Sequence, residues 1–398
     1  MFEITDKEKC CGCTACYSIC PQGCIKMIPD FEGFIYPLVD MKTCVQCGMC
    51  KAVCPIENSV CYASFDRKAY AIRSKKGDVL MESTSGGFFT PLATYLLDIG
   101  WTICAATYDE DFTVKHTLVS LDNGERYSLK RFKGSKYVQS DLNNCFQLIE
   151  HQLCERKSVC FIGTTCQVSG LKSYLRKEYE NLLTVDLVCH GTPSPKLWRK
   201  YIEFQTEKYG SSIANVSFRN KTYGYHSGTM KIEFSNGEIY YGSARIDHML
   251  KSFFNEIASR PICYKCPFKQ LERCSDFTIY DCWHISDLVA GLKDDDCGYT
   301  NLIVQSQKGA EIFETIKELY RYYDVDINRA VELDGSMVMR SAVPHPRRPE
   351  FYKKLDDNDL DKHIQKYIPI NKLDYALENM KGLLYKMGVL KILKKLLK

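Results

Sequence analysis

The chain has 398 residues, 45% of them hydrophobic and 26% charged, which are the proportions of an ordinary globular protein. Its net charge of +4 is too small to suggest a nucleic-acid partner. No stretch stays apolar for the roughly 18 residues that a membrane span needs, and the N-terminus has no signal-peptide pattern. The 22 cysteines therefore indicate metal ligation or redox chemistry in a reducing compartment, the cytoplasm, rather than disulfides.

Two cysteine runs near the N-terminus share one spacing. Each has three cysteines at two-residue intervals, then a fourth after three residues, followed by proline. Bacterial ferredoxins with two 4Fe–4S clusters use this spacing, and their fourth cysteine ligates the other cluster. The alternative, a pair of zinc knuckles, joins C-x-x-C units across longer gaps. We therefore expect one cluster on Cys10, Cys13, Cys16 and Cys54 and a second on Cys44, Cys47, Cys50 and Cys20.

The sequence predicts an α+β chain in which a small two-cluster ferredoxin domain at residues 1–60 precedes a mixed α/β domain at residues 61–350. The expected strands of the larger domain are Lys68–Ser74, Trp101–Thr107, Val114–Val119, Val159–Ile162 and Leu183–Val188. Its expected helices are Gly87–Asp98, Asn144–Glu155 and Pro195–Lys208. The pair Asn236-Gly237 predicts a hairpin turn, because both residues tolerate the positive φ of a type I′ turn.

Three glycine-containing corners can bind the phosphates of a cofactor. Ser83–Gly87 immediately precedes a predicted helix, where backbone N–H groups and the helix dipole favour an anion. Gly134–Tyr137 adds a lysine and an aromatic ring, and Gly163–Thr165 ends a strand. The alternative for each corner is a helix cap or a tight turn. Neither G-x-G-x-x-G nor a P-loop occurs, which disfavours a Rossmann NAD site and a Walker ATPase.

Four further cysteines form a second constellation. Cys166 and Cys189 each follow a predicted buried strand, and Cys263 and Cys266 make a C-x-x-C pair. Together they supply the four thiolates that a third 4Fe–4S cluster requires. A redox-active dithiol at the C-x-x-C pair and a structural zinc site are alternatives that the spacing leaves open.

Several sequence blocks follow the ferredoxin motif in a characteristic order. They are STSGG at Ser83–Gly87, GSKYVQS at Gly134–Ser140, GTTCQVSGL at Gly163–Leu171, VDLVCHGTPSP at Val185–Pro195, RPICYKCPFK at Arg260–Lys269 and SDFTIYDCW at Ser275–Trp283. With them the chain resembles the coenzyme F420 (deazaflavin) hydrogenase/dehydrogenase beta subunit family, in its bacterial form with a fused N-terminal ferredoxin. The resemblance runs from about Lys9 to Pro346 and departs from the family pattern at Thr165 and over Tyr280–His284.

The resemblance implies that the larger domain binds FAD, which exchanges a hydride with an organic or deazaflavin-like substrate and single electrons with the clusters. It implies a flavin site lined by Ser85, Gly86, Gly87, Ser135, Lys136 and Tyr137, and it supports a third cluster on Cys166, Cys189, Cys263 and Cys266. We add Thr164 and Thr165 from the third corner, and we expect His190 and Asp281 to deliver protons unless they are structural residues.

The implied partners are a redox protein or reduced carrier and a small-molecule substrate, and the family is associated with surface-polysaccharide metabolism. The expected protein is thus an iron–sulfur flavin-dependent oxidoreductase. The alternative is a non-catalytic electron-transfer subunit that serves a partner enzyme, and the sequence favours the enzyme because a long domain with its own cofactor-like corners follows the ferredoxin motif.

Residues 351–398 are predicted to form a linker, acidic and polar over Asp356–Asp361, and then a basic amphipathic helix over Met380–Lys398. At about 100° per residue, one face of this helix carries Val389, Leu390, Ile392, Leu393, Leu396 and Leu397, and the other carries Lys391, Lys394, Lys395 and Lys398. Such a helix either packs on its own domain or makes peripheral contact with the inner face of a membrane through residues 380–398.

Overall fold

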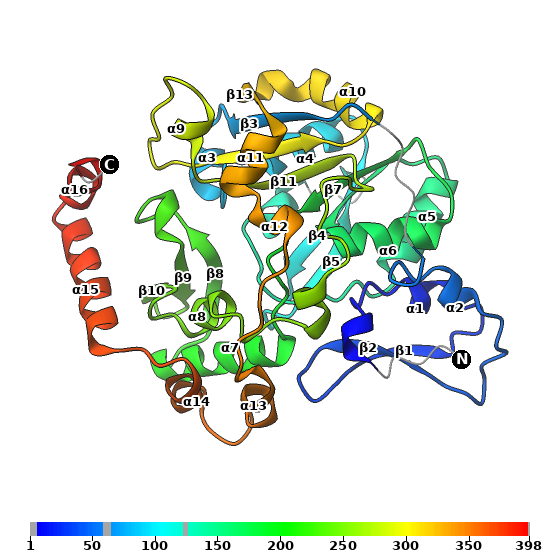
Figure 1. The fold of residues 1–398 in the computed structure, drawn as a ribbon, viewed down its shortest axis with the longest axis horizontal. Coiled ribbons are helices and arrows are strands. Elements are labelled where there is room, and N and C mark those ends of the chain that lie inside the picture. Colours follow the sequence, from blue (N-terminus) through cyan, green and yellow to red (C-terminus); the bar gives the residue numbers. More distant parts are fainter. Residues whose placement is uncertain (1–5, 59–64, 122–125, 397–398) are drawn as a thin grey trace.

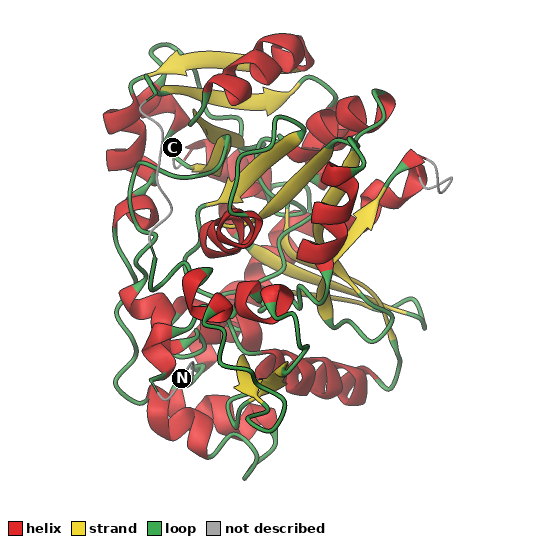
Figure 2. Ribbon diagram, turned by 90° about the vertical axis from the view of Figure 1, so that its right-hand side faces the viewer, coloured by secondary structure: helices red, strands yellow, loops and turns green. Residues whose placement is uncertain are grey.

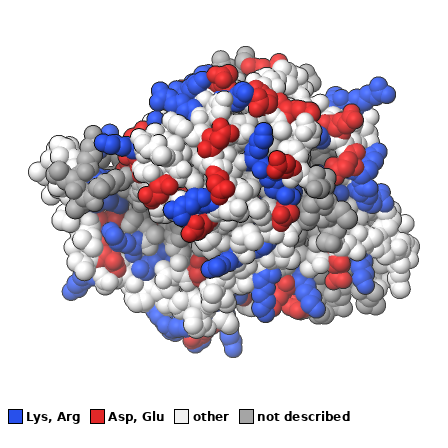
Figure 3. All heavy atoms as spheres, turned by 45° about the horizontal axis from the view of Figure 1, so that its top comes forward, with Lys and Arg blue, Asp and Glu red and all other residues white. Residues whose placement is uncertain are grey.

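Residues 6–58, 65–121 and 126–396 are described by the computed structural model of the chain, in which a small N-terminal module lies beside a larger α/β body (Figure 1). Basic and acidic side chains are interspersed over the face shown in Figure 3, in line with the net charge of +4. In the described part of the chain, no helix has both the length and the apolar composition to cross a membrane.

The N-terminal module contains one β-hairpin and short helices. Strands β1 (Ile25–Pro29) and β2 (Ile35–Val39) pair antiparallel. The helices are η1 (Lys7–Lys9), α1 (Ala15–Ile19) and α2 (Met49–Ala52). Helix α1 follows Thr14 at φ 65° and α2 follows Gly48 at φ 75°, so that each cysteine run bends back on itself. This is the ferredoxin-like region that the cysteine spacing predicts.

The body is built on an eight-stranded mixed sheet with strand order β13-β3-β12-β11-β7-β6-β4-β5. Its strands are β3 (Lys68–Ser74), β4 (Thr102–Tyr108), β5 (Val114–Val119), β6 (Val159–Thr164), β7 (Leu182–Leu187), β11 (Phe277–Cys282), β12 (Tyr299–Val304) and β13 (Tyr320–Val325). The central strands β4, β6, β7 and β11 are parallel, and the outer ones are antiparallel. The mixed α/β domain and its five predicted strands are confirmed, with ends shifted by one or two residues.

Helices cover both faces of this sheet (Figure 2). Helices α4 (Phe89–Asp98) and α10 (Gln307–Ile316) pack on one face, and α5 (Cys145–Cys154) and α6 (Thr165–Leu175) pack on the other. The remaining helices around the sheet are α3 (Gly77–Glu82), η3 (Arg126–Phe132), α9 (Ile285–Leu288), η6 (Lys317–Leu319), α11 (Ile327–Asp334) and α12 (Ser336–Met339). Burial on two sides explains why β6 and β7 are almost continuously apolar in sequence.

A second, antiparallel sheet of strand order β10-β9-β8 forms a lobe beside the first. Its strands are β8 (Ile213–Asn220), β9 (Thr229–Phe234) and β10 (Ile239–Ser243). The predicted turn at Asn236-Gly237 joins β9 to β10. It is not of type I′, because Gly237 has a positive φ of 88° and Asn236 does not. Helices α7 (Pro195–Tyr209), α8 (His248–Phe254), α13 (Arg348–Lys353) and α14 (Leu360–Tyr367) share the core of this lobe, and the short η4 (Tyr225–Ser227) and η5 (Pro261–Lys265) lie in its connections.

The C-terminal region differs from the expectation in two ways. The predicted linker over Asp356–Asp361 is a short turn at residues 354–359, and it lies between two helices, α13 and α14, that pack Phe351, Tyr352 and Ile364 into the core of the lobe. The predicted single helix over Met380–Lys398 is instead α15 (Lys372–Lys386) and α16 (Leu390–Leu396). Gly388 separates them at φ 74°, a conformation that glycine adopts without strain. Leu397 and Lys398 lie outside the described residues.

Candidate functional site

The eight cysteines of the N-terminal module gather into two groups. Burial raises the pKa of the Cys16 thiol, and the neighbouring thiols of Cys10 and Cys54 raise it further. Cys13 lies beside Cys10 and Cys16. These are the four cysteines that the sequence assigns to one cluster.

The second group contains the fourth cysteine of the first run. Cys50 lies beside Cys47 and Cys20, and Cys24 contacts both Cys20, at 3.3 Å between sulfur atoms, and Cys44. Cys20 has therefore crossed to the cysteines of the second run, which is the exchange that the ferredoxin spacing implies.

The four body cysteines converge on a small pocket between the main sheet and η5. Cys166 is in the first turn of α6, Cys189 follows β7, and Cys263 and Cys266 come from η5 and its end. Burial raises the pKa of the Cys263 thiol, and the adjacent thiols of Cys189, Cys166 and Cys266 add to the rise. Arg260, Lys269 and Arg273 also line this pocket and supply positive charge close to the sulfur atoms.

No three His, Cys, Asp or Glu side chains of the described residues lie close enough together to share one metal ion.

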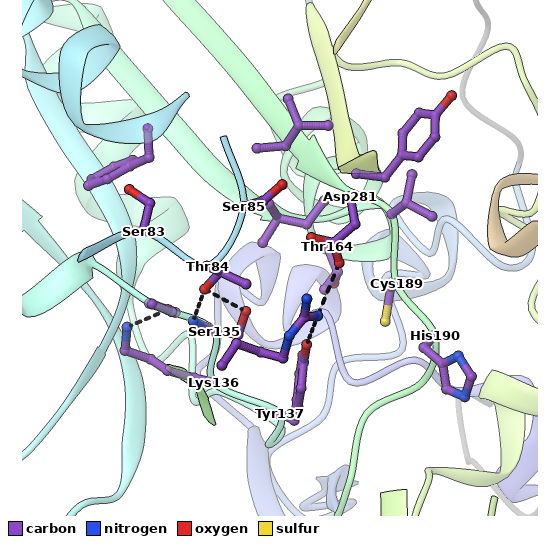
Figure 4. A pocket seen from close by; sticks show the side chains of 18 of the residues that line it. Ser83, Thr84, Ser85, Ser135, Lys136, Tyr137, Thr164, Cys189, His190 and Asp281 are labelled. Atoms are coloured by element: carbon purple, nitrogen blue, oxygen red, sulfur yellow. Dashed lines mark hydrogen bonds and ion pairs between the residues drawn. The ribbon is translucent and has the colours of Figure 1, made fainter. Parts of the chain in front are cut away.

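A large cavity of about 950 Å³ opens next to the cysteine pocket, and this volume is within the range of cofactor sites. Of the predicted flavin and proton-delivery residues, those that line it are Ser85, Gly87, Ser135, Lys136, Tyr137, Thr164, His190 and Asp281 (Figure 4). The first two glycine corners meet in its wall, because the backbone N–H and the hydroxyl of Ser135 contact Thr84 Oγ1 at 3.1 and 3.2 Å.

Lys136 is the cation of the second corner. Its ammonium group donates to the carbonyls of Phe132, Lys133 and Gly134 at 3.2–3.3 Å. Burial lowers the pKa of Lys136 to about 7. A phosphate in the cavity would favour its charged form, so the residue suits an anionic cofactor group.

Two predicted cofactor residues do not line this cavity. Gly86 faces the sheet instead: its N–H donates to Thr300 Oγ1 at 2.9 Å, and a Cβ there would come within 2.3 Å of the Ile72 carbonyl. Thr165 lies in the wall of the cysteine pocket, with its hydroxyl donating to Asp186 and accepting from Arg273. Thr164 lines the cavity and is also the N-cap of α6, where it pairs with Gln167. At the third corner, Gly163–Thr165, the alternative of a helix cap is therefore correct, together with a place in the cavity wall.

The two residues expected to deliver protons differ in their surroundings. His190 is half-buried, and its Nε2 is hydrogen-bonded to the Glu256 carboxylate. Asp281 accepts from Arg219 at 3.1 Å and from the Tyr225 hydroxyl at 3.0 Å. Both carboxylate oxygens of Asp281 thus already accept hydrogen bonds from the protein.

The structure adds two cavity residues that the sequence did not indicate. Arg219, from β8, is buried 4.5 Å from the centre of the Trp283 ring, and its Nη2 finds no partner among the described residues. His116, from β5, is also buried, and its Nδ1 has no hydrogen-bond partner among the described residues. Unpaired buried polar atoms are rare in folded proteins, so both side chains fit a bound polar group. Strand β8 also carries Asn215, Ser217 and Asn220, so no local sequence signal distinguishes Arg219.

Comparisons with known proteins find two family models along the chain. Residues 156–326 match the family described as coenzyme F420 hydrogenase/dehydrogenase, C terminus of the beta subunit, and residues 9–58 match the 4Fe-4S dicluster domain. Among solved structures, a chain of the F420-reducing NiFe hydrogenase complex from Methanosarcina barkeri, studied by xenon derivatization, is 16% identical. The match covers 68% of this chain and 88% of that one, with a TM-score of 0.45. No curated protein matches the chain.

Proposed function

Since the chain belongs to the coenzyme F420 hydrogenase/dehydrogenase beta subunit family and carries a fused 4Fe–4S dicluster domain, we propose that it is an iron–sulfur flavoenzyme that reduces or oxidises an organic or deazaflavin-like substrate. The family and the fused domain make the chain an electron-transfer protein related to oxidoreductase subunits. FAD in the large cavity and a third 4Fe–4S cluster in the cysteine pocket complete the proposal. When bound, FAD would exchange hydride with the substrate and single electrons with the clusters.

One observation carries this proposal: the cavity and the cysteine pocket share a wall. Cys166, Cys189 and His190 line both spaces. A group bound in the cavity is thus separated from the cysteine pocket by single side chains. This arrangement favours an enzyme over the alternative, an electron-transfer subunit without its own substrate site.

The N-terminal module presents its first cysteine group to the body. A Cβ at Gly170 of α6 would stand 2.6 Å from Cys13 Cβ, and the Cys11 thiol lies against Cys166. Cys47 of the second group is exposed. We therefore propose that a redox protein or reduced carrier exchanges electrons at the second group, and that the first group connects it to the body.

The chain's own residues suit the proposed ligands. The Ser135 hydroxyl at the second corner can bind a phosphate, and the Lys136 ammonium, whose three N–H groups donate to backbone carbonyls, can add its positive charge. Arg219 Nη2 can donate to a carbonyl or an anionic oxygen. We propose that His190, whose Nε2 is hydrogen-bonded to Glu256 at the cavity wall, delivers a proton to the substrate. The surface-polysaccharide role and the use of a deazaflavin rest on family association and are tested by substrate assays.

The first test is an anaerobic preparation analysed for flavin, iron and sulfide. We expect one FAD and about twelve irons per chain. Cys263→Ser should lower the iron to about eight and keep the FAD, whereas Cys154→Ser, at an exposed cysteine outside all three groups, should change neither. A preparation without FAD would contradict the enzyme proposal and favour the electron-transfer subunit. Zinc in place of the last four irons would contradict the third cluster.

A further inference from the structure

The side of helix α15 that faces solvent is apolar. Leu373, Met380, Leu383 and Met387 are 65%, 52%, 58% and 63% exposed. They are spaced by seven, three and four residues, which places them on one face of the helix and at its end. Ile392 and Leu393 continue the exposed apolar surface on α16. We call this set the apolar stripe.

The opposite side of α15 is attached to the body by polar contacts. Glu378, its one buried residue, accepts from the backbone N–H and the hydroxyl of Ser243 at 3.2 and 2.6 Å. Lys381 lies 4.7 Å from the centre of the Tyr223 ring. On α16, Lys394 donates to Asp296 at 2.8 Å. Leu377 and Leu384 are half-buried on this side, and the Tyr385 ring packs edge-on against Tyr223 with ring centres 5.1 Å apart. The apolar stripe, by contrast, has no partner in the described structure.

The two helices also border the large cavity. Lys381 and Lys394 both line it, and Figure 1 shows α15 and α16 along the outer edge of the β10-β9-β8 lobe. Whatever covers the apolar stripe is therefore separated from the cavity by the two helices alone.

The composition around the apolar stripe identifies the occupant. Lys372, Lys386 and Lys391 are exposed on the same two helices, and Tyr375 and Tyr385 are 40% and 42% exposed. Apolar side chains, lysines and tyrosines together are the features of a helix that lies in the interface of an anionic bilayer. A second copy of the chain would instead bring lysines against lysines.

We propose that α15 and α16 dock the molecule on an anionic lipid surface through the apolar stripe, with the cavity on the other side of these helices. This contact goes beyond the redox function and does not depend on it. The apolar side chains would enter the boundary between headgroups and acyl chains, and the lysines would meet the phosphates of the lipids.

The test uses the complete, cluster-loaded chain and sedimentation with vesicles. Binding to vesicles that contain phosphatidylglycerol should be at least about tenfold tighter than to vesicles of phosphatidylcholine alone, and added salt should weaken it. Leu383→Glu with Met387→Glu should reduce binding at least about tenfold, because two charges would have to enter the lipid. The control is Val343→Glu, at a residue that is 79% exposed and lies outside both helices. It should bind as the unchanged protein does.

Three results would overturn the proposal. The unchanged chain could fail to bind either kind of vesicle, or the double variant, with its cluster absorbance intact, could bind as well as the unchanged chain. Alternatively, light scattering could show a dimer that the double variant dissociates while no vesicle binding occurs, and a second copy would then be the occupant of the apolar stripe.

Discussion

At the scale of one residue, burial in the cavity wall changes the pKa of His116. Its ring is buried, its Nε2 contacts the Ile162 carbonyl at 3.1 Å, and its Nδ1 has no partner among the described residues. Burial lowers the pKa of His116 to about 4, and the contact with the carbonyl only partly opposes this. The imidazole is thus neutral at physiological pH and offers Nδ1 to the cavity.

This pKa predicts a pH dependence of stability. Between about pH 6.5 and pH 4 the unfolded chain binds a proton at His116 that the folded chain rejects, so the free energy of unfolding falls as the pH falls. Relative to His116→Gln, the unchanged protein should lose about 2 kcal/mol between pH 7 and pH 5. Urea unfolding of both proteins at each pH measures it. Parallel pH profiles would show that the ring is not held neutral.

Thr165 and Gly86 show why single residues at a corner were predicted less well than the corner itself. The pattern Gly163–Thr165 indicates a strand end, and the strand end is there. The direction of each side chain depends on partners far away in sequence, however. The Thr165 hydroxyl bonds Asp186 and Arg273, and Gly86 lies against Ile72 and Thr300.

At the scale of elements, α6 joins the module to the body. The helix begins at Thr165, carries Cys166 in its first turn, and passes Cys13 of the module at Gly170. Because a Cβ at Gly170 would stand 2.6 Å from Cys13 Cβ and 2.8 Å from its sulfur, the module can approach only if this position has no side chain.

Gly170→Ala should therefore disturb the first cysteine group. Alanine is favoured over glycine in a helix interior by about 1 kcal/mol, so the substitution would stabilise the protein if helix propensity were its only effect. We expect the opposite: lower iron content and a less stable protein, measured by iron analysis and urea unfolding. Gly77→Ala, with open space around the new Cβ, is the control and should keep its iron. Full iron content in the Gly170 variant would show that Cys13 can move away from a side chain at position 170 without loss of the cluster.

Elements defined by local pattern were predicted well, and those defined by distant contacts were not. The apolar runs of β6 and β7 and the Asn236-Gly237 turn carry their own signals. Arg219 reaches the cavity from a separate sheet, which no local pattern shows. The helical periodicity after Met380 was real, but Gly388 could be placed either inside a helix or between two, and the structure places it between them at φ 74°.

At the scale of the whole molecule, two buried arginines, Arg260 and Arg348, attach the N-terminal module to the body. Arg260 donates to the Cys10 carbonyl at 2.7 Å and lies 3.8 Å from the centre of the Tyr36 ring. Arg348, from α13, binds the Glu32 carboxylate through two hydrogen bonds of 3.0 and 2.6 Å. The β1–β2 hairpin, near the N-terminus, is thus held against the body by Arg348, from a helix near the C-terminus.

Removing one partner of the Arg348–Glu32 pair should loosen the module. Arg348→Met would leave the Glu32 carboxylate buried without its cation, at a cost of about 3–5 kcal/mol. Hydrogen exchange should rise by about two orders of magnitude or more in the hairpin amides of Ile25–Val39 and stay unchanged in β6 and β7. Arg347→Met, at the exposed neighbouring position, is the matched control and should leave both regions as they are. If the hairpin of the Arg348 variant stays as protected as before, the pair does not hold the module. Arg260, the close packing of Cys13 against Gly170 and hydrogen bonds such as that from the Ile35 N–H to Gln139 would then carry the attachment.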